Sequence, residues 1–150
     1  MSEKSVQNKI LSYSFVAIQF ICVVIIIATG PVIADGIYLF GQCAAIILGL
    51  WALLVMRHGL IRMVPDVGGN AVLIRQGPYR RVRHPMYTAL ILLMAALVFN
   101  EGSLLRFVTL AVLCLDLLGK LLYEEKLLRV SFDGYGAYCR TTWRLIPFIY

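Results

Sequence analysis

Apolar runs alternate with polar segments along the chain, and this alternation predicts four membrane-spanning helices. The first two runs cover residues 10–34 and 37–56. Each is long enough to cross a hydrocarbon core of ~30 Å, which takes about 20 helical residues. Two further apolar runs cover residues 85–100 and 104–123. The pattern predicts an all-α integral membrane protein in which residues 1–150 form one domain.

Breaker and capping residues set the expected helix ends. Thr29-Gly30-Pro31 breaks or bends the first helix, and the basic stop Arg57-His58-Gly59, with its helix-ending glycine, closes the second. Pro85 stands at the first position of the third helix, where its missing N–H costs nothing. Ser103 is a candidate N-cap for the fourth helix. That helix has no breaker before about Val130, so its last third should project into water.

Composition supports the membrane class. Hydrophobic residues make up 61% of the chain and charged residues 15%, with a mean hydropathy of +0.84. Soluble domains average ~45–50% apolar and about 25% charged. The net charge of +6 comes from basic residues beside apolar runs, which indicates topology rather than nucleic-acid binding. Four cysteines without a C-x-x-C pair, and only two histidines, argue against a disulfide framework and against a protein-built metal site.

The basic residues also predict the orientation. If the N-terminus is cytoplasmic, every lysine and arginine except Arg106 lies on the cytoplasmic side, as the positive-inside rule requires. Segments 57–84 and 124–150 are then both cytoplasmic, as are both termini. We expect a bacterial-type inner membrane protein whose opposite face has only two short turns.

The fourth helix carries one polar stripe. Asp116, Lys120 and Glu124 are spaced at i, i+4 and i+8, so they share a face. They form either a ladder of ion pairs at the membrane boundary or the polar wall of a cavity, because ionisable groups at membrane depth usually face a bundle interior. The sequence leaves both interpretations open.

The segment GPYRRVRHPMY, residues 77–87, is the most polar stretch beside an apolar run. Its arginines are explained first by topology and by attraction to anionic lipid headgroups. His84 stands where a helix begins, and the helix dipole there attracts an anion. Tyr79 and Tyr87 belong either to an interfacial aromatic belt or to a binding site, where they would stack on a ring or face a cation.

This segment, followed by YEEKLLRVSF, a glycine-bearing turn and YGAYCRTTWRLIPFI, resembles the isoprenylcysteine carboxyl methyltransferase family, which belongs with the membrane phospholipid methyltransferases. The shared pattern is G-x-Y-x-x-x-R-H-P-x-Y, a helical hairpin, E-E-x-x-L, a Phe, a Tyr-containing turn and a terminal R-x-I-P. The resemblance covers residues 71–148.

The resemblance implies a methyltransferase that uses S-adenosyl-L-methionine. Its cytoplasmic cofactor pocket would be formed by the loop between the second and third helices and by the C-terminal segment. The residues implied to bind the cofactor are Ala71, Val72, Leu73, Ile74, Tyr79, His84, Pro85, Met86, Tyr87 and Glu124. The stretch 71–74 would be extended and would bind partly through its backbone.

The resemblance also implies the groups that act on the methyl acceptor. Lys120 stands where members that methylate a prenylcysteine carboxylate have an arginine. An arginine can bind a carboxylate through two parallel hydrogen bonds, whereas a lysine ammonium acts as a single point charge. Methyl transfer needs positioning and a dry site more than a metal. A carboxylate or thiolate acceptor needs no strong base, whereas an amine acceptor would lose its proton to Glu124 or Glu125.

Three acceptors and two other functions stay open. A prenylcysteine-like carboxylate, a phospholipid amine and a small thiol all suit a hydrophobic pocket that a lipidic substrate enters from the bilayer. One alternative is an NADPH-dependent membrane reductase of the sterol reductase type, which shares R-H-P-x-Y. The other is a non-enzymatic membrane protein whose basic loops bind membrane lipids.

Overall fold

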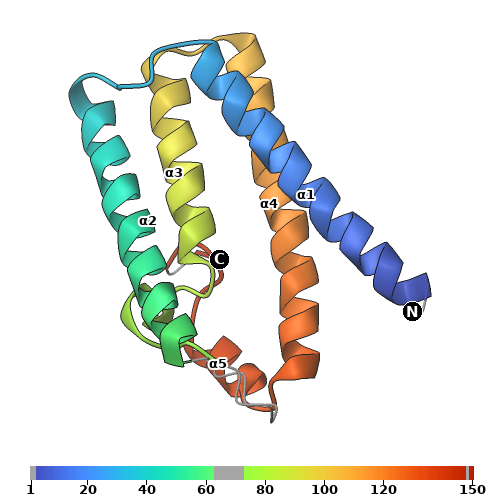
Figure 1. The fold of residues 1–150 in the computed structure, drawn as a ribbon. Helices are drawn as coiled ribbons and strands as arrows, with labels where there is room; N and C mark the ends of the chain where they lie inside the picture. Colours follow the sequence, from blue (N-terminus) through green and yellow to red (C-terminus); the bar gives the residue numbers. More distant parts are fainter. Residues whose placement is uncertain (1–2, 63–72, 148) are drawn as a thin grey trace. The chain divides into compact units, whose positions relative to one another are not determined.

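The computed structural model describes residues 3–62, 73–147 and 149–150, and the regular elements within them are all helices. In chain order these are α1 (Glu3–Ala28), α2 (Gly36–Arg62), the short 3-10 helix η1 (Gly77–Arg80), α3 (Pro85–Asn100), α4 (Leu104–Ser131) and α5 (Tyr135–Thr141) (Figure 1). The predicted all-α class is confirmed.

Among the described residues, two helices are long and apolar enough to cross a membrane, Ile10–Ala28 within α1 and Gly36–Arg57 within α2. α3 is apolar but has 16 residues, about 24 Å of helix, which is less than the ~30 Å of a hydrocarbon core. α4 has 28 residues, and Arg106, Asp116 and Lys120 interrupt its apolar character. These helices fit an integral membrane protein, while the crossing of the membrane by α3 and α4 stays a prediction.

Most helix ends agree with the breaker signals. Pro85 begins α3, and the amide of Arg106 lies 3.4 Å from Ser103 Oγ at the start of α4. α1 ends at Ala28, directly before the Thr29-Gly30-Pro31 break, and not at the predicted residue 34.

The predicted end of the second helix at Gly59 is wrong. α2 continues through that glycine to Arg62. A glycine inside a helix costs only about 1 kcal/mol, and the good helix formers Leu60 and Arg62 follow it.

The short helix α5 was not predicted. α4 ends at Ser131, and Phe132 and the turn Asp133-Gly134 lead directly into Tyr135–Thr141. The sequence indicated only a Tyr-containing turn there, because seven residues with two tyrosines and a glycine carry little helical periodicity.

The chain divides into two compact units, and each is described by itself. Unit 1 comprises Met1–Gln42 and Ile91–Glu125, and unit 2 comprises Cys43–Leu90 and Lys126–Tyr150. The predicted site residues divide in the same way. Those up to Tyr87 belong to unit 2, whereas Lys120, Glu124 and Glu125 belong to unit 1.

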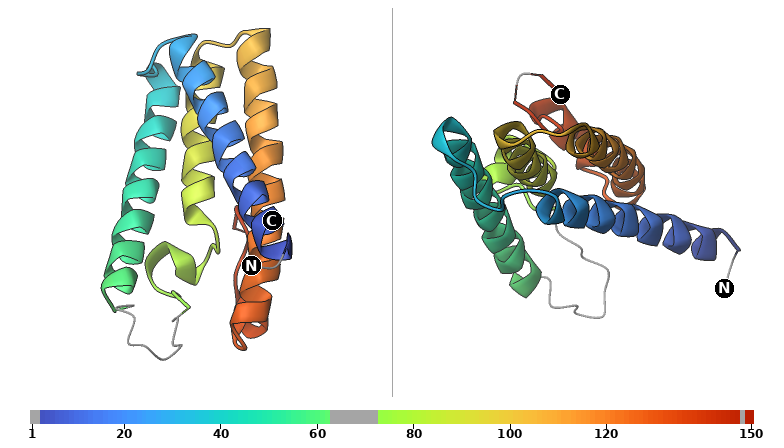
Figure 2. Two further views of the ribbon diagram at one scale, coloured as in Figure 1. Left: turned by 45° about the vertical axis from the view of Figure 1, so that its right-hand side comes forward. Right: turned by 90° about the horizontal axis from the view of Figure 1, so that it is seen from above.

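In unit 1, α1 and α4 run antiparallel along each other (Figure 2). The Lys120 ammonium donates to Gln19 Oε1 at 3.2 Å, and further along the pair the Arg106 guanidinium donates to the Ile26 carbonyl at 3.3 Å. Leu113 and Leu117, between these contacts, and Leu121, directly after Lys120, are fully buried on α4.

Arg106 joins two helix ends in unit 1. Its side chain is only 1% exposed and donates to the carbonyls of Ile26, in the last turn of α1, and of Glu101, directly after α3. Carbonyls at helix C-termini carry partial negative charge and lack helical partners. Gly30 leaves room for the guanidinium, because a Cβ there would lie 2.5 Å from Arg106 Nη1. Arg106, the one arginine that the positive-inside rule does not place on the cytoplasmic side, is therefore buried.

In unit 2, α2 and the start of α3 are in contact through small residues. A Cβ added to Gly49 would lie 3.5 Å from the Cβ of Ala89, which is ordinary van der Waals distance. Small residues allow such close approach between apolar helices.

We predict that Arg106→Ala lowers the free energy of unfolding in detergent micelles by about 2–4 kcal/mol, because two helix-end carbonyls lose their donor and a cavity opens. Thermal unfolding followed by circular dichroism measures this change. Arg129→Ala is the matched control, since Arg129 is exposed on the same helix, and it should cost less than about 0.5 kcal/mol. Equal destabilisation by the two variants would contradict the role of Arg106.

Candidate functional site

The loop before α3 begins with a glycine that no other residue can replace without strain. Gly77 has φ +58°, in the left-handed region. A Cβ there would lie 2.7 Å from Val55 Cγ2 and 3.2 Å from Trp51 Nε1 on α2. Pro78 then starts η1 and is buried. This turn fixes the backbone position from which the Tyr79 side chain projects.

The end of the same loop pairs with the C-terminal segment within unit 2. Val82 and Trp143 form a parallel β-bridge. The amide of Arg83 donates to the Trp143 carbonyl at 2.8 Å, and the amide of Trp143 donates to the Arg81 carbonyl at 2.9 Å. The amide of His84 donates to the Arg144 carbonyl at 3.1 Å. The backbone immediately before α3 is therefore held by residues from the other end of the chain.

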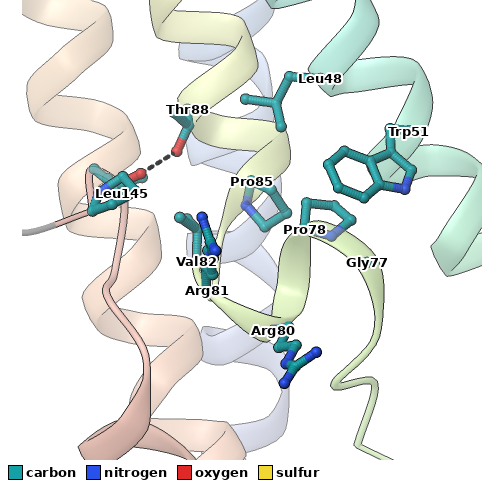
Figure 3. Close-up of a pocket in the computed structure, with 11 residues that line it drawn as sticks. Leu48, Trp51, Gly77, Pro78, Arg80, Arg81, Val82, Pro85, Thr88 and Leu145 are labelled. Atoms are coloured by element: carbon teal, nitrogen blue, oxygen red, sulfur yellow. Dashed lines mark hydrogen bonds between the residues drawn. The ribbon is translucent and has the colours of Figure 1, made fainter.

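Two side chains reinforce this pairing. The Arg83 guanidinium donates to the Cys139 carbonyl and to Thr142 Oγ1, both at 3.2 Å, and also to the Thr142 carbonyl. The Thr88 hydroxyl on α3 donates to the Leu145 carbonyl at 2.7 Å (Figure 3). Sequence reasoning gave neither residue this role, because nothing in the motif spacing tells which arginine points at the C-terminal carbonyls.

A buried tyrosine from α5 also holds the loop. The Tyr138 hydroxyl donates to the Tyr79 carbonyl at 2.5 Å, and the Arg75 guanidinium lies 5.5 Å from the centre of the Tyr138 ring. Burial raises the pKa of Tyr138 to about 12, although the nearby guanidiniums of Arg83 and Arg75 oppose the rise. Sequence reasoning missed Tyr138 as well.

Several predicted cofactor residues occur together at this loop. Tyr79 is 7% exposed, and its hydroxyl makes no hydrogen bond with any residue of the described ranges. Burial raises the pKa of this phenol, so it stays a neutral donor. His84 is buried and stacks on Tyr87, with ring centroids 5.3 Å apart and planes at 11°. Pro85 is buried, whereas Met86 is exposed.

The other predicted loop residues are only partly described. Ala71 and Val72 lie outside the described residues, so the structure does not address their expected extended conformation. Leu73 and Ile74 are half-buried and belong to no helix or strand.

The polar stripe of α4 lies in unit 1. Asp116 is buried, and neither carboxylate oxygen accepts a hydrogen bond from the part of the chain that the structure describes. Lys120 donates to Gln19 Oε1, and no hydrogen bond joins it to Asp116. Glu124 is half-buried and Glu125 is 3% exposed.

Unit 2 contains a pocket of about 510 Å³ against α2 (Figure 3). Leu48 and Trp51 project from α2 toward Pro78 and Pro85, and Arg80 and Arg81 carry the charge of its lining. Among the described cofactor residues of the sequence prediction, only Pro85 lines it.

A family model with the description "Phospholipid methyltransferase" matches residues 38–134, more than half of the chain. This range contains α2 from residue 38 onward, the loop, α3 and α4, and it ends at the turn before α5. The match confirms the predicted place among membrane phospholipid methyltransferases, whereas a specificity like that of the isoprenylcysteine enzymes stays a prediction. Comparisons with curated proteins and with solved structures give no match.

We predict that Tyr138 makes stability fall at high pH. The folded state keeps the phenol proton up to about pH 12, whereas an unfolded tyrosine loses it near pH ~10. The contribution is therefore fully present below pH ~10 and is lost as the pH rises toward about 12. The free energy of unfolding should fall more steeply over this interval in the wild type than in Tyr138→Phe. Parallel pH profiles of the two proteins would contradict the assignment.

Proposed function

Because the chain belongs to the phospholipid methyltransferase family, we propose that it transfers a methyl group from S-adenosyl-L-methionine to a lipid-like acceptor. The family supports methyl transfer in general. The cofactor, the acceptor and the residues that act on them are the finer parts of this proposal.

The observation that carries the cofactor assignment is the Tyr79 hydroxyl. It is buried and lacks a hydrogen-bond partner among the described residues. Leaving such a group unsatisfied costs about 1–3 kcal/mol, so a ligand that accepts its hydrogen bond would be favoured. The cofactor's ribose and carboxylate oxygens are acceptors of this kind, and the residues present fit the group.

The neighbouring loop residues suit the rest of the cofactor. α3 begins at Pro85, and the positive end of its dipole would stabilise the carboxylate of the methionine part. The stacked rings of His84 and Tyr87 offer a flat aromatic face to an adenine or to a sulfonium. When bound, the cofactor supplies an electrophilic methyl group. Leu73, Ile74 and Met86 complete the proposed binding set, with Ala71 and Val72 before them and Glu124 on α4.

The proposed acceptor residues are on α4. Lys120 would hold the negative charge of the acceptor, as a phosphate or carboxylate, by a point charge. Glu124 or Glu125 would take the proton of an amine acceptor before methyl transfer. The family description favours a phospholipid amine over a prenylcysteine-like carboxylate or a small thiol. We also propose that α3 and α4 cross an inner membrane of bacterial type, that the termini are cytoplasmic, and that the lipid enters from the bilayer.

We predict that Tyr79→Phe weakens binding of S-adenosylhomocysteine about fivefold, because only one hydrogen bond is lost. His84→Ala and Glu124→Ala should each weaken it more than about tenfold, because the loss of a whole side chain removes several contacts. Isothermal titration calorimetry in detergent measures all three. Tyr13→Phe, at a tyrosine that is 73% exposed, is the control and should bind like the wild type.

Wild-type affinity in the three site variants would refute the assignment. Binding of NADPH instead would favour the reductase alternative, and binding of neither would favour a lipid-binding protein.

We predict that Lys120→Ala lowers methyl transfer to the acceptor while leaving cofactor affinity within about twofold of the wild type, since the ammonium is assigned to the acceptor alone. Transfer of tritiated methyl groups from the cofactor into a membrane lipid extract, with identification of the labelled product, measures the change and names the acceptor. An effect confined to cofactor affinity would contradict this role.

A further inference from the structure

We propose that the pocket against α2 is a binding site for one anionic phospholipid. Of the described residues, it shares only Pro85 with the proposed cofactor residues and none with the proposed acceptor residues. All of its lining belongs to unit 2. The proposal does not depend on methyl transfer.

The apolar part of the site suits an acyl chain. The pocket holds about 510 Å³, and its walls include Leu48, Trp51, Val82 and Leu145 (Figure 3). Leu48 and Trp51 lie in the part of α2 that is apolar enough to cross a membrane. An acyl chain from the surrounding bilayer therefore reaches this wall without crossing water.

A second, polar hollow adjoins the first through a shared arginine. It measures about 300 Å³ and is lined by Arg75, Arg80, Tyr138, Thr141 and Thr142, together with Ala137. Arg80 lines both hollows. Hydroxyl groups and guanidiniums are the donors that phosphate groups bind in proteins. A phosphate at Arg80 would thus lie where the apolar and the polar hollows meet.

The charges decide which headgroup fits. Arg80 and Arg81 are exposed, and their guanidiniums make no hydrogen bond or ion pair with the residues that the structure describes. Arg75 is fixed in place, donating to the Gly134 carbonyl at 3.0 Å. Of the described residues that line the two hollows, none is acidic. An anionic headgroup is attracted by all three arginines, whereas the ammonium of a zwitterionic headgroup would have no counter-charge.

The position of the site gives the bound lipid a structural effect. Val82 and Leu145 line the pocket and belong to the two segments whose backbones pair before α3. A lipid seated between them contacts both segments at once. Its binding therefore stabilises the pairing by mass action, because the lipid binds only when both segments are in place.

Trp51 provides a direct test. The chain has two tryptophans, so Trp143→Phe leaves Trp51 as the only one. In reconstituted vesicles, phosphatidylglycerol with brominated acyl chains should quench Trp51 fluorescence at about fivefold lower mole fraction than brominated phosphatidylcholine. This fivefold factor corresponds to the attraction between one arginine and an anionic lipid surface. Equal quenching by the two lipids would overturn the proposal.

Two arginine variants in the same background separate a site from general charge attraction. Arg80→Gln should abolish the preference for phosphatidylglycerol, whereas Arg140→Gln should keep it, because Arg140 is exposed on α5 and lines neither hollow. Circular dichroism checks that each variant is folded, and Arg81→Gln replaces Arg80→Gln if the latter is not. Equal loss in the Arg80 and Arg140 variants would show a diffuse charge effect and refute the site. Displacement of the brominated lipid by soluble glycerol phosphate at equal concentration would refute the acyl-chain part.

Discussion

The backbone pairing between residues 81–84 and the C-terminal segment is the constraint on which the candidate site depends. Within its described part, residues 73–84, the loop that carries Tyr79 and His84 has no regular sheet or long helix of its own, since η1 spans only Gly77–Arg80. Its amide and carbonyl groups would be unsatisfied in an apolar setting if Trp143 and Arg144 did not pair with them. The pairing thus fixes the direction in which α3 starts, and with it the orientation of the His84 ring.

Arginine side chains satisfy backbone carbonyls in both units. Arg83 donates to the carbonyls of Cys139 and Thr142 in unit 2, and Arg106 donates to the carbonyls of Ile26 and Glu101 in unit 1. A guanidinium suits this role because its donors form a fixed fork and it stays charged when partly buried. These two arginines therefore stabilise the fold, whereas Arg80 and Arg81 are exposed.

Local sequence signals predicted the helices well and the contacts of the site poorly. Apolar run length predicted that α2, α3 and α4 exist, and Pro85 and Ser103 marked helix starts correctly, because these signals act within one turn. The hydrogen bonds of Arg83 and Tyr138 join residues 56–59 positions apart, and no periodicity encodes which partner each one meets. The motif resemblance predicted the family, which the family match supports, but it gave no reason for the role of α5.

Hydrogen–deuterium exchange tests the central claim, that the C-terminal segment holds the loop proposed to bind the cofactor. The account predicts that the amides of Arg83, His84 and Trp143, which donate across the pairing, exchange slowly in the free protein. It also predicts that S-adenosylhomocysteine slows the exchange of the loop and of the C-terminal segment together. Exchange of the Trp143 amide at the rate of an unstructured peptide while that ligand is bound would contradict the account.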